Sequence, residues 1–181
     1  CKPGLEEHRG LIEACKKSLE VPKNGVALEC QKYIPFGESI AEKIKMEKKL
    51  ERKNFLTTLG YVLDYIGEYK KAEKWNKEVL GISEEVLGEN HPDTANSYNN
   101  LALVYERQGE YEKAKVLYEK SLRISKEVLE ENHPSTARSY HNLAGVYSRQ
   151  GEYEKAKQLF EKSLRINKEV LGENHPNTAN S

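Results

Sequence analysis

The sequence has no excess of charge of either sign. Its 29 basic and 29 acidic residues make up 32% of the 181-residue chain, and the formal net charge is zero. A protein without a global positive field is not drawn to DNA, RNA or anionic membranes. The chain also has no apolar run long enough to span a bilayer and no secretory signal pattern. We therefore expect no nucleic-acid partner and no membrane partner.

Cysteine is scarce. Cys1, Cys15 and Cys30 are the only three, and their spacing fits no metal or redox motif. An odd number without such spacing favours free thiols in a reducing compartment, so we expect a cytoplasmic protein. A bridge between Cys15 and Cys30 is the alternative.

Motifs for catalysis and cofactor binding are missing. The chain has no G-x-S-x-G, H-E-x-x-H, Walker loop or G-x-G-x-x-G sequence, so we predict no enzyme activity and no cofactor. His91, His133 and His175 recur at a fixed interval. A zinc ion needs ligands at about 2 Å, whereas packed helices lie on the order of 10 Å apart. We therefore predict no metal and interpret these histidines as residues that order the start of a helix.

What the sequence has in abundance is repetition. Residues 91–132 and 133–174 are two copies of a 42-residue unit that differ at nine positions. A diverged copy covers residues 49–90, and a further copy begins at residues 175–181. A fixed period of this length predicts a solenoid in which each unit packs on its neighbours. Because the chain starts at Cys1 and stops inside a repeat, we interpret it as part of a longer array.

Each repeat is expected to form two antiparallel helices. In residues 91–132, His91 and Pro92 open the first helix and Gly109 closes it. The second helix starts near Glu110, with small residues such as Ala114 allowing close approach to the first. Its exposed side should carry ion pairs such as Glu119 with Arg123, four residues apart. The apolar residues expected on its buried side are Tyr111, Ala114, Leu117, Tyr118, Leu122, Val128 and Leu129.

Residues 1–48 carry a weaker pattern. We expect helices over residues 5–20 and 26–33, with a turn at residues 21–25 between them. One long helix over residues 38–56 should then cross into the first clear repeat. This segment is either a decayed repeat or an N-terminal cap.

The repeat resembles the tetratricopeptide repeat, through Tyr98, Leu101, Ala102, Tyr105, Gly109, Tyr111 and Ala114. That family's usual repeat has about 34 residues. The 42-residue period, the "LG.NHP" joint and the "YNNLA.VY..QG.Y.KA" core instead resemble kinesin light chains and their relatives, which include nephrocystin-type proteins and the sensor arrays of some signalling NTPases. The resemblance covers residues 49–181. It implies an all-α, right-handed superhelical solenoid of antiparallel helix hairpins.

The resemblance also implies a binding surface, because in this family one face of each first helix lines a concave groove. Asn100 and Asn142 match the asparagine that peptide-binding members use to hold a ligand's backbone, since a carboxamide donates and accepts at once. Arginines can receive ligand carboxylates with forked geometry. The groove positions are Asn96, Asn99, Asn100, Leu103 and Arg107, then Arg138, His141, Asn142, Gly145 and Arg149, and in the diverged copy Asn54, Thr57, Thr58, Tyr61 and Tyr65.

Differences between the two near-identical copies gather on this helix. The nine include positions 96, 99, 103 and 106 against 138, 141, 145 and 148. We therefore predict a non-enzymatic scaffold or adaptor that binds an extended, partly acidic peptide, as the resemblance to kinesin light chains implies. The alternatives are a polar face with no ligand, a regulatory sensor array of a larger signalling NTPase, and a structural spacer that associates end to end.

Overall fold

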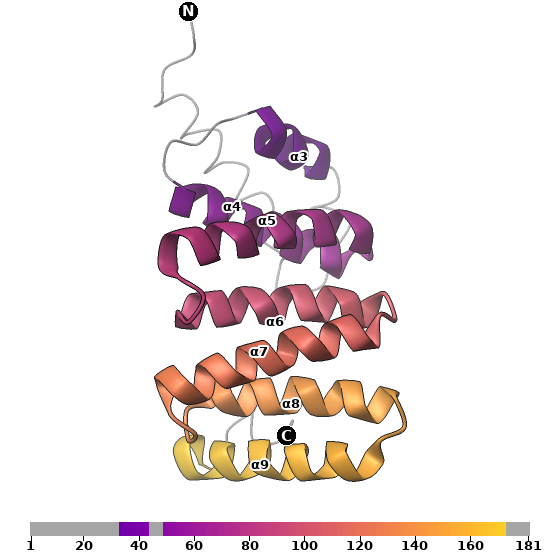
Figure 1. Ribbon diagram of the computed structural model, residues 1–181. Helices are drawn as coiled ribbons and strands as arrows, with labels where there is room; N and C mark the ends of the chain where they lie inside the picture. The colour runs from indigo at the N-terminus through magenta and orange to yellow at the C-terminus, as the bar shows by residue number, and fades with distance from the viewer. Residues whose placement is uncertain (1–32, 44–48, 173–181) are drawn as a thin grey trace, which may run out of the picture. The chain divides into compact units, whose positions relative to one another are not determined.

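The computed structural model describes residues 33–43 and 49–172, which form seven α-helices and no strand. The chain divides into two compact units, residues 1–82 and 83–181. Figure 1 shows the helices of each unit, coloured along the chain. The expected helix over residues 5–20, the turn at 21–25, the expected helix over 26–33 except for its last residue, the three cysteines and the start of the fourth repeat at 175–181 lie outside the described residues.

The N-terminal unit contains α3 (Ile34–Lys43), α4 (Lys49–Tyr65) and most of α5 (Tyr69–Leu87). The turn between α4 and α5 uses Gly67 at φ +85°, a conformation that costs glycine little. Arg52 donates from Nε to Glu78 at 2.6 Å and so links α4 to α5. The fully buried residues of this hairpin include Phe55, Leu56, Leu59, Val62, Leu63 and Ala72, with Trp75 almost fully buried.

The expectation of one long helix over residues 38–56 is wrong. Helix α3 ends at Lys43, α4 begins at Lys49, and the two helices pack against each other. Two carboxylates one turn apart on α3 pair with lysines of α5. Lys71 Nζ lies 3.0 Å from Glu38, and Lys74 Nζ lies 2.7 Å from Glu42.

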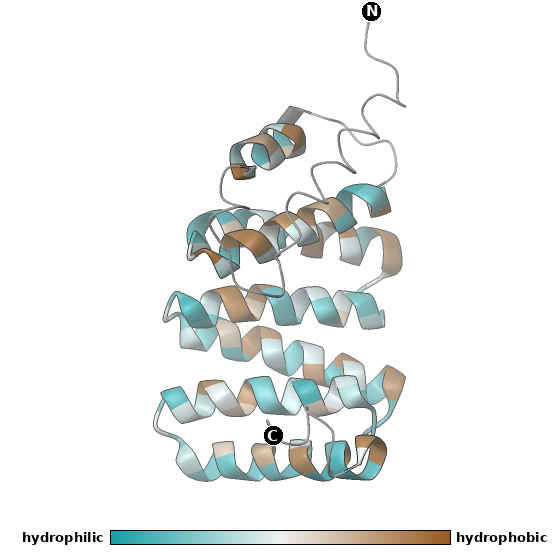
Figure 2. Ribbon diagram, turned by 180° about the vertical axis from the view of Figure 1, so that it is seen from behind, coloured by the Kyte–Doolittle hydropathy of each residue, from teal (hydrophilic) through white to brown (hydrophobic). Residues whose placement is uncertain are grey.

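The C-terminal unit contains two helix hairpins, as the repeat predicts. The first pairs α6 (Pro92–Arg107) with α7 (Tyr111–Leu129), and the second pairs α8 (Pro134–Arg149) with α9 (Tyr153–Leu171). Helix α8 packs on both α7 and α9, so the hairpins share a core. Figure 2 shows hydrophilic and hydrophobic residues interleaved along each helix, as expected when one side of a helix is buried and the other exposed.

The histidines at the joints cap the first helices. His91 Nδ1 accepts a hydrogen bond from the backbone amide of Asp93 at 3.0 Å. In the next repeat His133 Nδ1 accepts from the amide of Ser135 at 3.1 Å. Amides in the first turn of a helix have no partner within the helix, so each contact satisfies one of them. The interpretation of these two histidines as residues that order a helix start is confirmed, while His175 lies outside the described residues.

Burial along α7 differs from the expectation at two points. Val128 is 46% exposed, so its assignment to the buried side is wrong, and Ile124 is fully buried in its place. Val128 lies in the last turn of α7, which has 19 residues where the first helices have 16. Arg123 pairs with Glu127 at 2.9 Å rather than with Glu119.

Candidate functional site

The predicted binding surface lies on the sides of α6 and α8 that face away from the core. On α6, Asn100 and Arg107 are exposed and Leu103 is 37% exposed. On α8, Arg138 and Arg149 are exposed and Asn142 is half-buried. We call these six residues the first-helix face: Asn100, Leu103, Arg107, Arg138, Asn142 and Arg149.

Asn99 does not lie on this surface, contrary to the expectation from its spacing. It is 6% exposed, and its Nδ2 donates to Ser121 Oγ at 2.8 Å and lies 3.5 Å from Ser139 Oγ. The two serines are themselves 3.4 Å apart. Asn99 therefore joins α6, α7 and α8 in a buried polar cluster, and its amide group is hydrogen-bonded within the protein.

Besides the long Asn99–Ser139 contact, three hydrogen bonds connect α8 to α6, and we call these three the inter-repeat ladder. Arg138 Nη2 donates to Asn96 Oδ1. Asn142 Nδ2 lies 3.5 Å from Asn99 Oδ1, and Arg149 Nε lies 2.8 Å from Glu106 Oε1. Every donor is on α8 and every acceptor is on α6. Four of the predicted ligand-binding side chains, Asn96, Arg138, Asn142 and Arg149, thus also hold neighbouring repeats together.

Glu106 is a structural residue of this site that the sequence prediction did not place in the groove. Its side chain is only 11% exposed, although it carries a charge. One oxygen accepts from Arg149, and the other accepts from the hydroxyl of Tyr118 at 3.0 Å. The signal that could have identified it is its place among the nine differences, since residue 148 is a serine.

His141 is half-buried rather than presented to solvent. Its ring meets the ring of Phe160 edge to face, with 5.1 Å between centroids. Burial lowers the pKa of His141, and the negative charge of Glu106 acts in the opposite direction. The imidazole therefore serves in packing between α8 and α9.

Asn100 differs from its neighbours because its side chain makes no hydrogen bond to any part of the chain that the structure describes. Asn142 makes one long hydrogen bond, which leaves its carbonyl oxygen and one amide hydrogen available. Helices α6 and α8 together carry three arginines, Arg107, Arg138 and Arg149, and two acidic residues, Asp93 and Glu106. The two helices thus have an excess of one positive charge, which is a weaker bias than three arginines alone suggest.

In the N-terminal unit the predicted groove residues lie on α4. Thr57 and Thr58 use their hydroxyls within the helix, donating to the backbone oxygens of Lys53 at 2.8 Å and Asn54 at 3.2 Å. Asn54 itself is exposed, and so are the rings of Tyr61 and Tyr65, one helical turn apart. This face therefore offers aromatic surface where α6 offers leucine and arginine.

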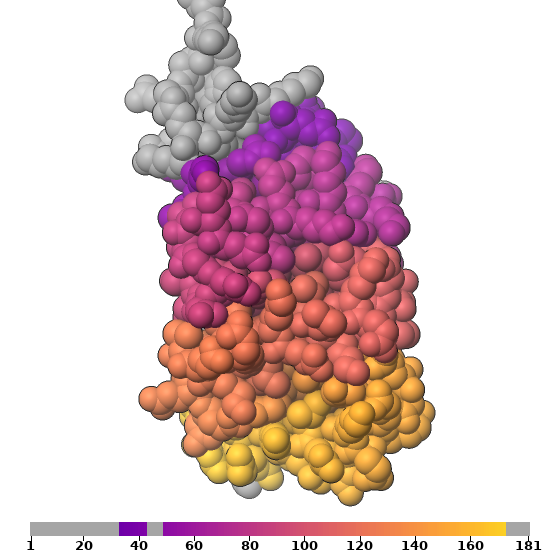
Figure 3. Space-filling view, in the orientation of Figure 1, coloured from indigo at the N-terminus to yellow at the C-terminus, as the bar shows by residue number. Residues whose placement is uncertain are grey.

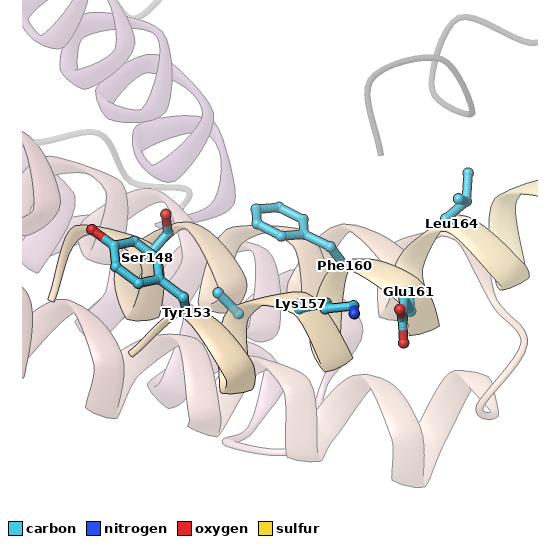
Figure 4. Close-up of a pocket in the computed structure, with 7 residues that line it drawn as sticks. Ser148, Tyr153, Lys157, Phe160, Glu161 and Leu164 are labelled. Carbon is cyan, nitrogen blue, oxygen red and sulfur yellow. The ribbon is translucent and has the colours of Figure 1, made fainter. Parts of the chain in front are cut away.

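A shallow hollow of about 360 Å³ lies on α9. Figure 4 shows the side chains that line it: Ser148, Tyr153, Lys157, Phe160, Glu161 and Leu164. In the space-filling view the atoms of α9, in yellow, lie at the surface of the C-terminal unit (Figure 3). The hollow is apolar at its centre, and Lys157 and Glu161 carry the charges of its lining.

Two features are absent from the described residues. Over residues 33–43 and 49–172 no group of three or more His, Cys, Asp or Glu side chains could hold a metal ion. Within the same ranges no helix is both long and apolar enough to cross a bilayer.

Comparison with known proteins identifies a repeat family. A family model described as tetratricopeptide repeat matches residues 52–127, 97–169 and 142–181. No curated protein sequence matches the chain.

Solved structures share the fold. RapI in its apo form is 22% identical with a TM-score of 0.76, over 96% of this chain and 60% of RapI. A proposed kinesin light chain of Podosopora anserina with nearly identical TPR-like repeats is 23% identical with a TM-score of 0.72, over 97% of this chain and 82% of that protein. BtubC (BKLC) from P. vanneervenii is 19% identical with a TM-score of 0.68, over 90% and 74%. The shared architecture is an all-α helical repeat solenoid.

Proposed function

The chain belongs to the tetratricopeptide repeat family, and from this premise we propose that it is a non-enzymatic scaffold that binds an extended peptide on the first-helix face. Its repeats are of the kinesin-light-chain-like type. Solenoids of this kind use surfaces built from successive repeats to bind other proteins. The finer proposal is a role as an adaptor that attaches a partner through a short, partly acidic segment.

The observation that carries this proposal is the state of Asn100. Its amide group is exposed and makes no hydrogen bond to a described residue, whereas the adjacent Asn99 is buried and fully engaged. A carboxamide can donate to a peptide carbonyl and accept from a peptide N–H, so it can hold an extended backbone. Asn142 stands at the equivalent place one repeat further on and keeps its carbonyl oxygen and one amide hydrogen available for a ligand.

The surroundings of Asn100 favour a particular ligand chemistry. Leu103 lies almost one turn further along α6 and offers an apolar contact, and Arg107 follows after another turn. Arg138 and Arg149 border Asn142 on α8. Arginine binds carboxylates in a forked geometry, so a ligand with an apolar side chain flanked by acidic residues fits this face.

A titration of acidic and basic peptides of equal length tests the proposal. The double variant Asn100→Ala with Asn142→Ala should weaken binding by about 0.5–1.5 kcal/mol per hydrogen bond lost. Asn132→Ala is the matched control, because Asn132 is exposed in the joint before α8 and lies away from the face. Acidic peptides should bind more tightly than basic ones, and more weakly as salt rises.

Two results would overturn the proposal. One is equal binding of acidic and basic peptides, which would remove the role of the arginines. The other is binding that the double variant leaves unchanged, which would remove the role of the asparagines and favour a structural spacer.

A further inference from the structure

The two arginines of helix α8 bond to different kinds of acceptor on α6. Arg149 Nε lies 2.8 Å from Glu106 Oε1, so its charge faces a carboxylate. Arg138 Nη2 donates to Asn96 Oδ1, which is the oxygen of a neutral amide. One arginine is therefore part of an ion pair, whereas the other is held in place without being neutralised.

The charge of Arg149 stabilises the carboxylate of Glu106. That carboxylate is largely buried, and its other oxygen accepts from the hydroxyl of Tyr118 at 3.0 Å. The hydrogen bond to Glu106, together with the attraction between the opposite charges, raises the pKa of Arg149. A ligand carboxylate at Arg149 would compete with one that the fold already holds there, and the buried Glu106 would lose its counter-ion. Arg149 is thus a poor anchor for an acidic ligand residue.

Arg138 has the opposite properties. Its side chain is exposed, and the hydrogen bond to Asn96 is its only polar contact among the residues that the structure describes. A guanidinium has five N–H groups, so four stay available, enough to bind both oxygens of a carboxylate. Asn96 holds one edge of the group, which reduces the entropy that a ligand must remove when it binds.

Arg138 also lies close to the asparagine that we assign to the ligand backbone. Arg138 and Asn142 are four residues apart on α8, so their side chains share one side of the helix. The rise between them is about 6 Å, whereas Arg149 lies roughly 10 Å from Asn142 in the other direction. A peptide held by Asn142 therefore has an available guanidinium within about one turn of α8.

The two near-identical repeats differ at this position. Residue 138 is an arginine where the equivalent residue 96 is an asparagine, while Arg107 and Arg149 are the same in both copies. The available charge of Arg138 thus has no equivalent on α6. An acidic residue of a ligand is directed to α8, which distinguishes one repeat from the other.

We propose that Arg138 is the residue that binds a ligand carboxylate on the first-helix face, and that Asn96 positions it for this role. Arg149 instead stabilises the fold through Glu106. The inference rests on the proposed function, because it assigns the acidic preference of the first-helix face to one side chain.

Two peptides of equal length test the assignment. Both are acetylated and amidated, with one leucine flanked by glutamates in the first and by glutamines in the second. The ratio of their dissociation constants is the acidic preference. Arg138→Gln keeps an N–H for Asn96 and should lower this preference by about two- to fivefold, the effect of one exposed ion pair. The salt dependence of binding should weaken with it. Arg138→Lys keeps the charge and should retain most of the preference.

The matched control removes the other arginine together with its counter-ion. The double variant Glu106→Gln with Arg149→Gln leaves the net charge unchanged and keeps an acceptor for Tyr118, so the acidic preference should stay as it is. A third variant leaves Arg138 in place. Asn96→Asp gives Arg138 a carboxylate partner, as Arg149 already has, and should lower the preference to the level of Arg138→Gln.

An acidic preference that Arg138→Gln leaves intact would overturn the assignment, and so would an equal loss in the double variant at residues 106 and 149. In both cases the proposed function stands if Asn100→Ala with Asn142→Ala still weakens the binding of both peptides. Binding of neither peptide to the unaltered chain would overturn the assignment and the proposed function together.

Discussion

Glu106 on α6 and Arg149 on α8 form an ion pair across two repeats, with 2.8 Å between Arg149 Nε and Glu106 Oε1. The two partners differ in burial, since the side chain of Glu106 is 11% exposed and that of Arg149 is 59% exposed. Tyr118 is fully buried and donates its hydroxyl to the second carboxylate oxygen at 3.0 Å. The carboxylate therefore stabilises the packing of three helices, while the guanidinium stays largely in water.

The difference in burial predicts that replacing Glu106 lowers stability more than replacing Arg149. Glu106→Ser should lower the free energy of unfolding by about 1–3 kcal/mol, because the buried Tyr118 hydroxyl loses its acceptor. Arg149→Ala should cost at most about 1 kcal/mol, since exposed ion pairs are screened by solvent. Urea unfolding measures both, with the exposed Glu119→Ser as the control. Equal losses for Glu106→Ser and Arg149→Ala would contradict this account.

Substitutions of the adjacent asparagines on α6 should have different effects, one on stability and the other on peptide binding. Asn99→Ala removes the buried donor to Ser121 and should cost about 1–3 kcal/mol of stability. Asn100→Ala should change stability by no more than about 0.5 kcal/mol, because the residue is exposed, but should weaken peptide binding. Thermal unfolding and peptide titration of both variants check this. A stable Asn99→Ala variant would show that the buried cluster is not needed for packing.

Ala114 tests the close approach of α6 and α7. It has no exposed surface, and Ala72 and Ala156 occupy the same place in the other repeats. Ala114→Leu should overpack this contact and cost about 1–3 kcal/mol. Val116→Leu, at an exposed position of the same helix, is the control. An unchanged melting temperature for Ala114→Leu would refute the proposed packing.

Stability should depend on pH through His141, because burial lowers its pKa while Glu106 partly opposes the shift. The unfolded chain then binds the proton more readily. The stability that neutral His141 contributes is therefore complete above the unfolded pKa of about 6.5, and it is lost as the pH falls below that value. His141→Asn, which introduces the residue found at position 99, should flatten this part of the decline. The measurement is unfolding free energy at a series of pH values, and an unchanged slope would remove His141 as the cause.

The hairpins of the C-terminal unit could be predicted from the sequence because their determinants are local. Apolar residues at helical spacing, a proline at the start and Gly109 at the end each act within one helix or one turn. The prediction of one long helix over residues 38–56 is wrong because the position of α3 depends on residues distant in the sequence. Lys71 and Lys74, on α5, pair with two carboxylates of α3.

The candidate site was harder to predict for a related reason. Asn99 and Asn100 are adjacent and chemically identical, yet one is buried and the other exposed. Neighbouring residues of a helix point about 100° apart, and the packing of α7 and α8 against α6 decides which side is covered. The burial of Glu106 likewise follows from the packing of α7 and α8 around it. That the first-helix face binds a peptide stays a prediction.

Two glycines inside first helices should respond differently to alanine. In the middle of a helix alanine is favoured over glycine by about 0.8–1.0 kcal/mol. At Gly145 an added Cβ would meet only Glu106 Oε1, at 3.9 Å, so Gly145→Ala should stabilise the protein by up to about 1 kcal/mol. At Gly60 the Cβ would lie 2.7 Å from Asn76 Nδ2, which donates to the Ala72 backbone oxygen at 2.9 Å in the core. Displacing that amide costs about 0.5–1.5 kcal/mol and any strain in addition, so Gly60→Ala should be neutral or destabilising. Urea unfolding of the two variants gives the comparison, and equal stabilisation by both would show that Asn76 moves aside without loss.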